Sequence, residues 1–247
     1  MAAARLRLIA ALAVLAAWQA LASSGLLFRD VVPSLWRIAA ALAITLSDPA
    51  FYANLGVTAG EYTIAVALGG VGGAGAGLVL GANQFCAAAY ERWVHYLAPV
   101  PKIIFFPALL LAFGAGPGSK IAMGTISCFF PVAISVASGV RDVRPILLLV
   151  GRGFRANSWQ MAVKIYLPAV REPLLNGLRL GFGVAAIGVL LAETKLSKAG
   201  VGFLVMDAWR RFDMPGMYAL LILVVLLVAA INAGVTRLNQ QPGQTRT

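Results

Sequence analysis

The sequence is poor in charged residues. Asp, Glu, Lys and Arg make up 12% of its 247 residues, which is about half the share found in ordinary soluble domains. Hydrophobic residues account for 60%, and the mean hydropathy is +0.85. This composition excludes a soluble globular domain and indicates a chain that lies largely in lipid.

Cysteine and histidine are also scarce, and the common catalytic motifs are missing. Cys86 and Cys128 lie in separate apolar stretches without a CxxC pattern, so neither a disulfide framework nor a zinc site is expected. The one histidine, His95, follows Glu91 at a predicted helix end, where we expect an interfacial residue. Metalloprotease, serine hydrolase and P-loop motifs do not occur, so we predict no catalytic residues, no metal, no cofactor and no ATP site in this chain.

Basic residues exceed acidic ones, 20 against 9, which gives a net charge of +11. They flank the apolar segments instead of forming one dense patch, so nucleic-acid binding is not expected. With a cytoplasmic N-terminus, 13 of the 20 Lys and Arg residues fall in inner segments and seven in outer ones. Cytoplasmic loops carry the excess of Lys and Arg, which predicts that both termini and the largest loop, residues 141–173, are cytoplasmic.

Six apolar runs are candidates for membrane spans, which need about 20 residues each. A shorter apolar stretch, Leu35–Leu46, follows Pro33, and we expect it to lie on the membrane surface. We therefore predict an all-α integral membrane protein with about six transmembrane helices. The predicted spans are Leu8–Phe28, Ile64–Gly81, Ile103–Ala115, Ile121–Val140, Leu174–Ala192 and Met214–Thr236.

The first run has a second interpretation. Arg5 and Arg7 precede it, and Ala20-Leu21-Ala22 resembles the cleavage site of a secretory signal. The run continues to Phe28 and further spans follow, which favours an uncleaved helix.

A glycine stripe marks the second span. Gly69, Gly73, Gly77 and Gly81 recur every four residues and therefore share one helix face. Such a stripe lets a neighbouring backbone approach closely in lipid. Helix packing is the main interpretation, and a gating hinge is the alternative.

Two acidic residues lie at the outer ends of predicted spans. Glu193 ends the fifth span, where a carboxylate is costly to bury and could line a substrate path. The alternative is a solvated helix end beside Lys195 and Lys198. We expect Glu61, at the start of the second span, to be interfacial.

The basic loop contains a candidate amphipathic helix. Asn157 or Ser158 is a plausible N-cap, and Pro168 ends the helix or bends the chain beyond it. An amphipathic helix between two spans either lies on lipid or inserts into a partner's groove. The residues spaced to share one helix face are Trp159, Ala162, Val163 and Tyr166.

This loop resembles the coupling loop of binding-protein-dependent ABC importer permeases, most closely those of the nitrate, sulfonate and taurine group. The resemblance spans roughly residues 54–232, most of the chain, and lies in the order and spacing of several motifs. The matching segments are Pro99–Gly116, Arg155–Pro173, Gly177-Leu178-Arg179-Leu180, Ala192-Glu193, Gly200–Leu204 and Arg211–Ala219.

The resemblance implies a type I ABC importer transmembrane fold over residues 54–236. Residues 1–53 would form an N-terminal transmembrane helix and a periplasmic surface helix, and residues 237–247 a cytoplasmic tail. The implied function is that of a non-catalytic permease in a bacterial inner membrane, which forms the path for a nitrate-like, sulfonate-like, taurine-like or related small solute. The residues implied in ATPase coupling are Arg155, Ala156, Asn157, Ser158, Trp159, Gln160, Lys164, Leu167 and Pro168.

The implied partners are ABC ATPase subunits that bind ATP, a periplasmic solute-binding protein, a second permease chain of the same or a different kind, and membrane lipid. Rigid-body motion of the spans would then open the solute path alternately to the two sides of the membrane. An ion-driven secondary transporter is the alternative function, although buried mid-membrane charges and inverted repeats are not evident. A membrane scaffold without transport is a third.

The loop also departs from the family pattern. Counting back from Pro168, the family's Glu-Ala-Ala falls on Leu149-Val150-Gly151, and its turn glycine falls on Arg155. Gly153 is a candidate to supply the turn instead, because glycine tolerates positive φ. Pairing with a second, different permease whose loop is intact is one hypothesis that accounts for the change.

Overall fold

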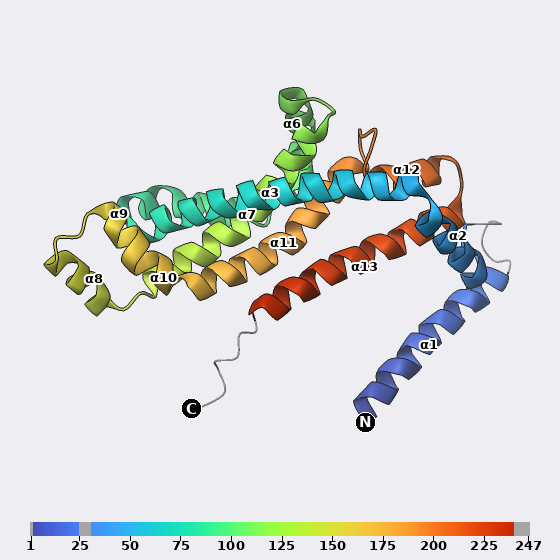
Figure 1. Cartoon of the computed structure of the whole chain (residues 1–247), viewed down its shortest axis with the longest axis horizontal. Helices are drawn as coiled ribbons and strands as arrows, with labels where there is room; N and C mark the ends of the chain where they lie inside the picture. Colours follow the sequence, from blue (N-terminus) through green and yellow to red (C-terminus); the bar gives the residue numbers. More distant parts are fainter. Residues whose placement is uncertain (1, 25–30, 240–247) are drawn as a thin grey trace. The chain divides into compact units, whose positions relative to one another are not determined.

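The computed structural model describes residues 2–24 and 31–239, in which helices joined by short turns and loops are the secondary structure and no strand occurs (Figure 1). Two compact units are present within these residues. One combines Met1–Val57 with Ala199–Leu227, and the other combines Thr58–Lys198 with Val228–Thr247. Each unit is described separately.

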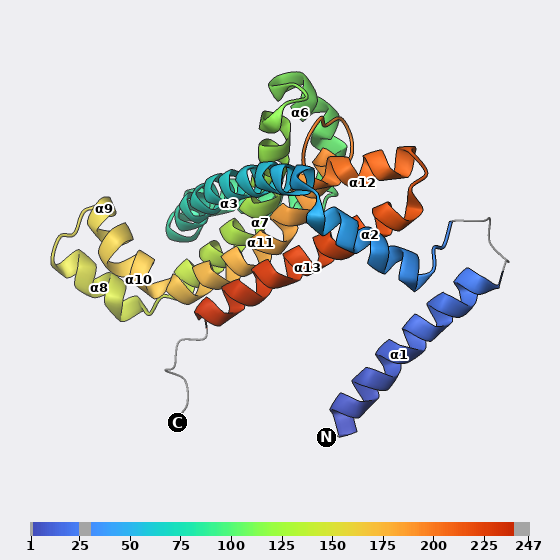
Figure 2. The same cartoon turned by 45° about the vertical axis from the view of Figure 1, so that its right-hand side comes forward.

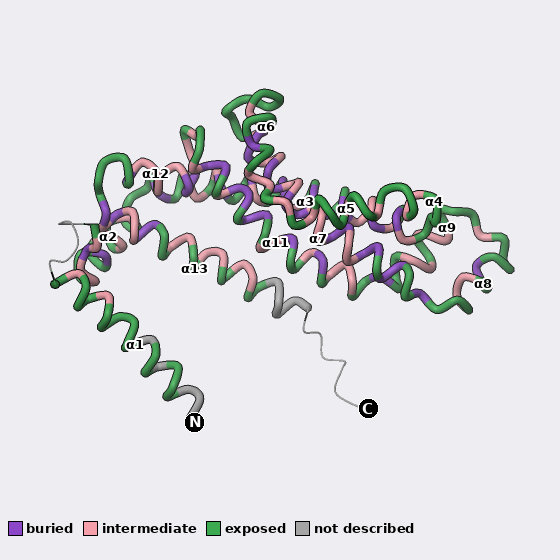
Figure 3. The backbone as a smooth tube through the Cα atoms, turned by 180° about the vertical axis from the view of Figure 1, so that it is seen from behind, coloured by how far each residue is buried: buried purple, intermediate pink, exposed green. Residues whose placement is uncertain are grey.

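The first unit contains α1 (Ala2–Ser23), α2 (Leu35–Ser47), the start of α3 (Pro49–Ala82), α12 (Val201–Arg210) and the first part of α13 (Met214–Asn239). Trp18 of α1 donates its indole N–H to the Pro33 carbonyl at 3.0 Å and packs edge-to-face on Tyr218 of α13. The Asn54 side chain of α3 accepts the Gly200 N–H at 2.8 Å, just before α12 begins. α1 is exposed along most of its described length, so its apolar surface is available to lipid (Figure 3).

In the second unit, α3 and α11 (Arg171–Glu193) both pack against α7 (Pro117–Arg141), as Figures 1 and 2 show. The glycine stripe of α3 faces α7. A Cβ added at Gly73 would lie 2.7 Å from the Phe129 carbonyl, and one at Gly77 would lie 2.6 Å from the Ala133 carbonyl. Gly69 and Gly81 meet α7 in the same way. The two backbones therefore approach so closely along this stripe that side chains would separate them.

Small and β-branched residues form the core between these helices. Every fourth residue of α7 from Cys128 to Val140 takes part, and these are at most 3% exposed. α11 faces the same core with glycines: a Cβ at Gly181 would lie 2.8 Å from Cys128 Sγ. The tight packing explains why a thiol serves here as a small apolar group, without a metal or disulfide partner among the described residues.

The third predicted span is not one straight helix. Gln84–Leu97 comprises α4 (Gln84–Cys86), the π-helical turn η1 (Ala87–Glu91) and α5 (Arg92–Leu97), and Lys102–Phe113 comprises η2 (Lys102–Phe105) and α6 (Phe106–Phe113). The two halves bend by 99°. Pro99 and Pro101 lie at the bend and cannot continue a helix, since proline lacks the N–H and restricts the residue before it. The prediction of a span over Ile103–Ala115 alone is therefore wrong.

The other predicted spans are helices in the structure. Five helices are long and apolar enough to cross a membrane, and the bent pair raises the number to six if it counts as one span. The predicted short helix Leu35–Leu46 corresponds to α2, which is one residue longer. α3 has 34 residues and is longer than the span predicted there. Residues 25–28 of the first predicted span and residues 240–247 of the predicted tail lie outside the described residues. The predicted division at residues 53/54 and 236/237 stays a prediction.

Candidate functional site

The basic loop folds into a compact helical segment at one end of the second unit (Figure 1). It begins with α8 (Pro145–Gly153) and continues through α9 (Ser158–Met161), η3 (Ala162–Tyr166) and α10 (Leu167–Ala169) to α11. Asn157 is the N-cap of α9: its side chain accepts the Gln160 N–H at 2.8 Å, and Gln160 accepts the Asn157 N–H at 3.0 Å. This reciprocal pair is a capping box, which satisfies two N–H groups that the first helical turn leaves unbonded. Of the two predicted N-caps, Asn157 is confirmed.

The predicted apolar face of this helix is wrong in part. η3 is π-helical, so its turns hold more residues than the α-helical spacing assumes. Met161 and Ile165 face inward, because a Cβ at Gly151 of α8 would lie 2.5 Å from both side chains. Trp159 is 75% exposed and Val163 39% exposed, so both are turned away from that contact.

Arg155 adopts the left-handed conformation at the end of α8, with φ of 52°. Its N–H donates to the Arg152 carbonyl at 2.9 Å, and the Ala156 N–H donates to the Gly151 carbonyl at 3.0 Å. These two bonds define a Schellman motif, in which the left-handed position strongly favours glycine. Gly153 lies within α8 and is not among the residues with positive φ. The suggestion that Gly153 supplies the turn is therefore wrong, and Arg155 takes up the conformation itself.

A groove of about 400 Å³ separates α8 from the α9–η3 helix. Phe154 forms part of its wall and is 85% exposed. Gln160 and Lys164 line the opposite side. Together with the outward-facing Trp159, the segment presents aromatic side chains surrounded by basic ones on a surface that no described residue of the second unit covers.

Two adjacent grooves lie along α7 and α11 of the same unit. The larger encloses about 630 Å³ and the smaller about 250 Å³. Lys102, Ser127 and Val184 line both. The larger groove continues to Asp142, just beyond the end of α7, and most of its wall is apolar.

A buried polar cluster joins α3, α7 and α11. Glu61, Lys120 and Glu193 are each at most 5% exposed, and their charges interact. The Thr58 hydroxyl donates to Glu193 Oε1 at 2.7 Å. Oε2 of Glu61 is buried without a hydrogen-bond partner. The Lys120 ammonium donates to three carbonyls of the flanking loops, those of Ala115, Gly116 and Leu196.

Both acidic residues are thus more buried than the sequence suggested. Glu61 is not interfacial, and Glu193 is not a solvated helix end, because their side chains lie between packed helices. Hydropathy could not reveal this burial, because a charged residue near the end of an apolar run is assigned to the end of a membrane span. Glu193 is not among the residues that line the two grooves, and its place in a solute path stays a prediction.

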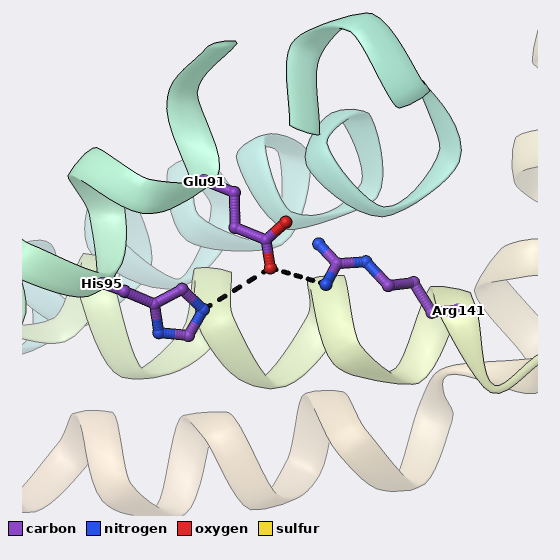
Figure 4. A network of polar contacts seen from close by, with 3 residues as sticks. All are labelled: Glu91, His95 and Arg141. Carbon is purple, nitrogen blue, oxygen red and sulfur yellow. Dashed lines mark hydrogen bonds and ion pairs between the residues drawn. The ribbon is translucent and has the colours of Figure 1, made fainter. Parts of the chain in front are cut away.

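An ion pair also links η1 to the end of α7. Figure 4 shows the Glu91 carboxylate between Arg141, at 2.5 Å, and His95, at 3.6 Å. The side chains are partly exposed, so the contact contributes at most about 1 kcal/mol. His95 is thus positioned by its neighbour one helical turn earlier and contacts no group that suggests catalysis.

Comparison with known proteins adds to this geometry. A putative aliphatic sulfonates transport permease of Bacillus subtilis is 29% identical over 92% of this chain and 82% of its own length. A putative ABC transporter permease of Methanocaldococcus jannaschii is 30% identical over 64% of this chain and 60% of its own length. The taurine transport permease of Escherichia coli is 26% identical over 69% of this chain and 63% of its own length. Residues 31–241 match the family described as binding-protein-dependent transport system inner membrane component, and the chain belongs to this family of ABC importer permeases.

Proposed function

We propose that this chain forms, with a second permease chain, the path by which a sulfonate-like or related small solute enters the cell. Two of the similar permeases are named for the transport of aliphatic sulfonates and of taurine, which carries a sulfonate group, and others are named for formylaminopyrimidine and bicarbonate. The ion-driven alternative does not fit the family to which the chain belongs. A periplasmic binding protein would deliver the solute to the outer face, and the termini would be cytoplasmic, as the distribution of Lys and Arg predicts.

The observation that carries the proposal is the exposed aromatic and basic surface of the α8–α10 segment. Trp159 and Phe154 project from it, and Arg155 and Lys164 supply positive charge. Tryptophan and arginine are enriched among the few residues that carry most of the binding energy of a protein interface. We propose that this surface docks an ABC ATPase, which binds and hydrolyses ATP in place of the P-loop that the permease lacks.

The docking residues follow from the same surface. Ser158 and Gln160 belong to the capped first turn of the coupling helix, so the cap fixes the direction in which Trp159 points. Leu167 and Pro168 are exposed on α10, where the segment turns toward α11. Movement of the docked ATPases would be transmitted through α10 to α11 and would switch access between the two sides as a rigid-body change.

The test is Trp159→Ala in the permease reconstituted with its ATPase and binding protein. We expect ATP hydrolysis to lose its dependence on solute and uptake to fall by about tenfold or more, because truncating an interface hot spot costs about 2 kcal/mol. Trp93→Ala is the matched control, since Trp93 is also exposed, at 64%, but lies outside the segment. Normal uptake by Trp159→Ala, with the protein inserted as in wild type, would contradict the proposal.

A further inference from the structure

The two grooves along α7 and α11 contain a single positive charge. Of all the residues that line them, Lys102 and Asp142 are the charged ones, and Lys102 lines both grooves. The Lys102 ammonium lies 5.1 Å from the centre of the Phe130 ring, whereas Asp142 follows Phe130 by twelve residues, about 18 Å by the rise of an α-helix. The potential at the junction of the grooves is therefore set by Lys102.

The Lys102 ammonium is held at this junction by local contacts. It donates to the Ala98 carbonyl one turn earlier and lies 5.1 Å from the centre of the Phe130 ring. The proline bend between α5 and η2 turns this part of the chain inward against α7. The side chain thus belongs to the groove wall, whereas a lysine that serves as a membrane anchor extends toward the aqueous interface.

This ammonium lacks a counter-ion. The described residues form no ion pair with Lys102, and one carbonyl and one aromatic face satisfy only part of its three N–H donors. Lys102 is partly buried, and the partial loss of water around a cation in a largely apolar groove costs free energy that a nearby anion would offset. Groups that can donate further hydrogen bonds follow along the larger groove, namely the Ser138 hydroxyl and the Asn176 amide.

We propose that Lys102 is the anion-recognising residue of the solute path, where its ammonium pairs transiently with a sulfonate or carboxylate group at the junction of the two grooves. A passing anion supplies the missing counter-charge, whereas a neutral solute of the same size does not. The attraction is moderate, because one ammonium provides it and this ammonium keeps its hydrogen bond to the Ala98 carbonyl. The anion can therefore also leave, as conduction requires. The inference rests on the proposed transport function, but its first test requires no transport.

The first test measures the sign of the charge in the groove. In a Cys86→Ser background, Ile134→Cys places a thiol on the partly exposed wall of the larger groove, one helical turn beyond Phe130 and about two turns before Asp142, and buried Cys128 stays in place. The purified full chain is treated with anionic sulfonatoethyl methanethiosulfonate and, separately, with cationic trimethylammonioethyl methanethiosulfonate. The ratio of the two labelling rates reports the local potential.

We expect Lys102→Gln to lower this ratio by about tenfold or more, the size of effect that one unit charge produces over a few ångströms in a partly solvated groove. Lys102→Arg should preserve the ratio, because it keeps the charge. A thiol at Ser158, outside both grooves, is the control, and its ratio should not respond to Lys102. A ratio at Ile134→Cys that changes less than twofold in Lys102→Gln would overturn the proposal.

The second test uses transport by the reconstituted complex with ethanesulfonate as the probe. Lys102→Gln should reduce uptake by about tenfold, and Lys102→Arg should retain most of it. Uptake by Lys102→Gln equal to wild type would overturn anion recognition while leaving the permease function intact. The converse failure is separate: if wild type transports no sulfonate but Lys102 still sets the labelling ratio, the substrate in the proposed function is wrong and the anion site stands.

Discussion

Replacing Arg155 with glycine tests the most unusual feature of the coupling segment. A non-glycine residue in the left-handed conformation costs about 1–2 kcal/mol, and Arg155 adopts it with φ of 52°. Glycine removes this strain but gives the unfolded turn more freedom, which offsets about 0.5–1 kcal/mol. Arg155→Gly should therefore stabilise the end of α8 by about 0.5–1 kcal/mol.

Amide hydrogen exchange measures this change where it occurs. The amides of residues 155 and 156 close the Schellman turn, so their exchange follows its local opening. A gain of 0.5–1 kcal/mol corresponds to about two- to fivefold slower exchange, after correction for the intrinsic rate next to glycine. Measurement in detergent micelles by mass spectrometry resolves this range.

Gly153→Ala is the matched control, because it distinguishes a left-handed turn at Arg155 from one at Gly153. Gly153 lies inside α8, and a Cβ there would meet nothing within 4 Å. Alanine should therefore slow exchange in α8, since it favours a helix interior by up to about 1 kcal/mol over glycine. If Gly153→Ala speeds exchange, or Arg155→Gly leaves it unchanged, the assignment of the turn to Arg155 is refuted.

The sequence predicted the helices that are straight and uniformly apolar, because those depend on length and hydropathy alone. It failed for the segment around Pro99 and Pro101, where the chain bends by 99° between two short apolar helical segments. Apolar composition is the same on either side of such a bend, so hydropathy does not register it. The prolines did mark the place, but their effect on direction depends on the packing of Phe106 and its neighbours against α7.

The sequence pattern also did not predict the left-handed turn residues or the burial of the acidic side chains. A left-handed residue is predictable when it is glycine, but Arg155 and Phe212 both adopt positive φ where the sequence offers no glycine. Local hydrogen bonds of the helix ends hold these conformations against the intrinsic preference. Glu61 and Glu193 likewise look like span boundaries, and only the position of Lys120 between their helices shows that they form a cluster.

Two further substitutions test the packing of the second unit. Gly77→Ala places a Cβ 2.7 Å from that of Val136 on α7, so we expect the thermal midpoint in detergent to fall by several degrees, as for an overpacking cost of about 1–3 kcal/mol. Gly75→Ala on the same helix meets nothing within 4 Å and should slightly raise the midpoint, because alanine favours a helix interior over glycine, so a fall equal to that of Gly77→Ala would contradict the close approach of α3 and α7. Thr58→Val keeps the shape of the side chain but removes the hydroxyl that donates to Glu193. A buried carboxylate that loses a donor costs about 1–3 kcal/mol, so the midpoint should again fall, whereas Thr58→Ser retains the hydroxyl and should restore most of it. A lower midpoint for the serine variant than for the valine variant would show that packing of the Thr58 methyl group, and not the hydrogen bond, stabilises this end of the helices.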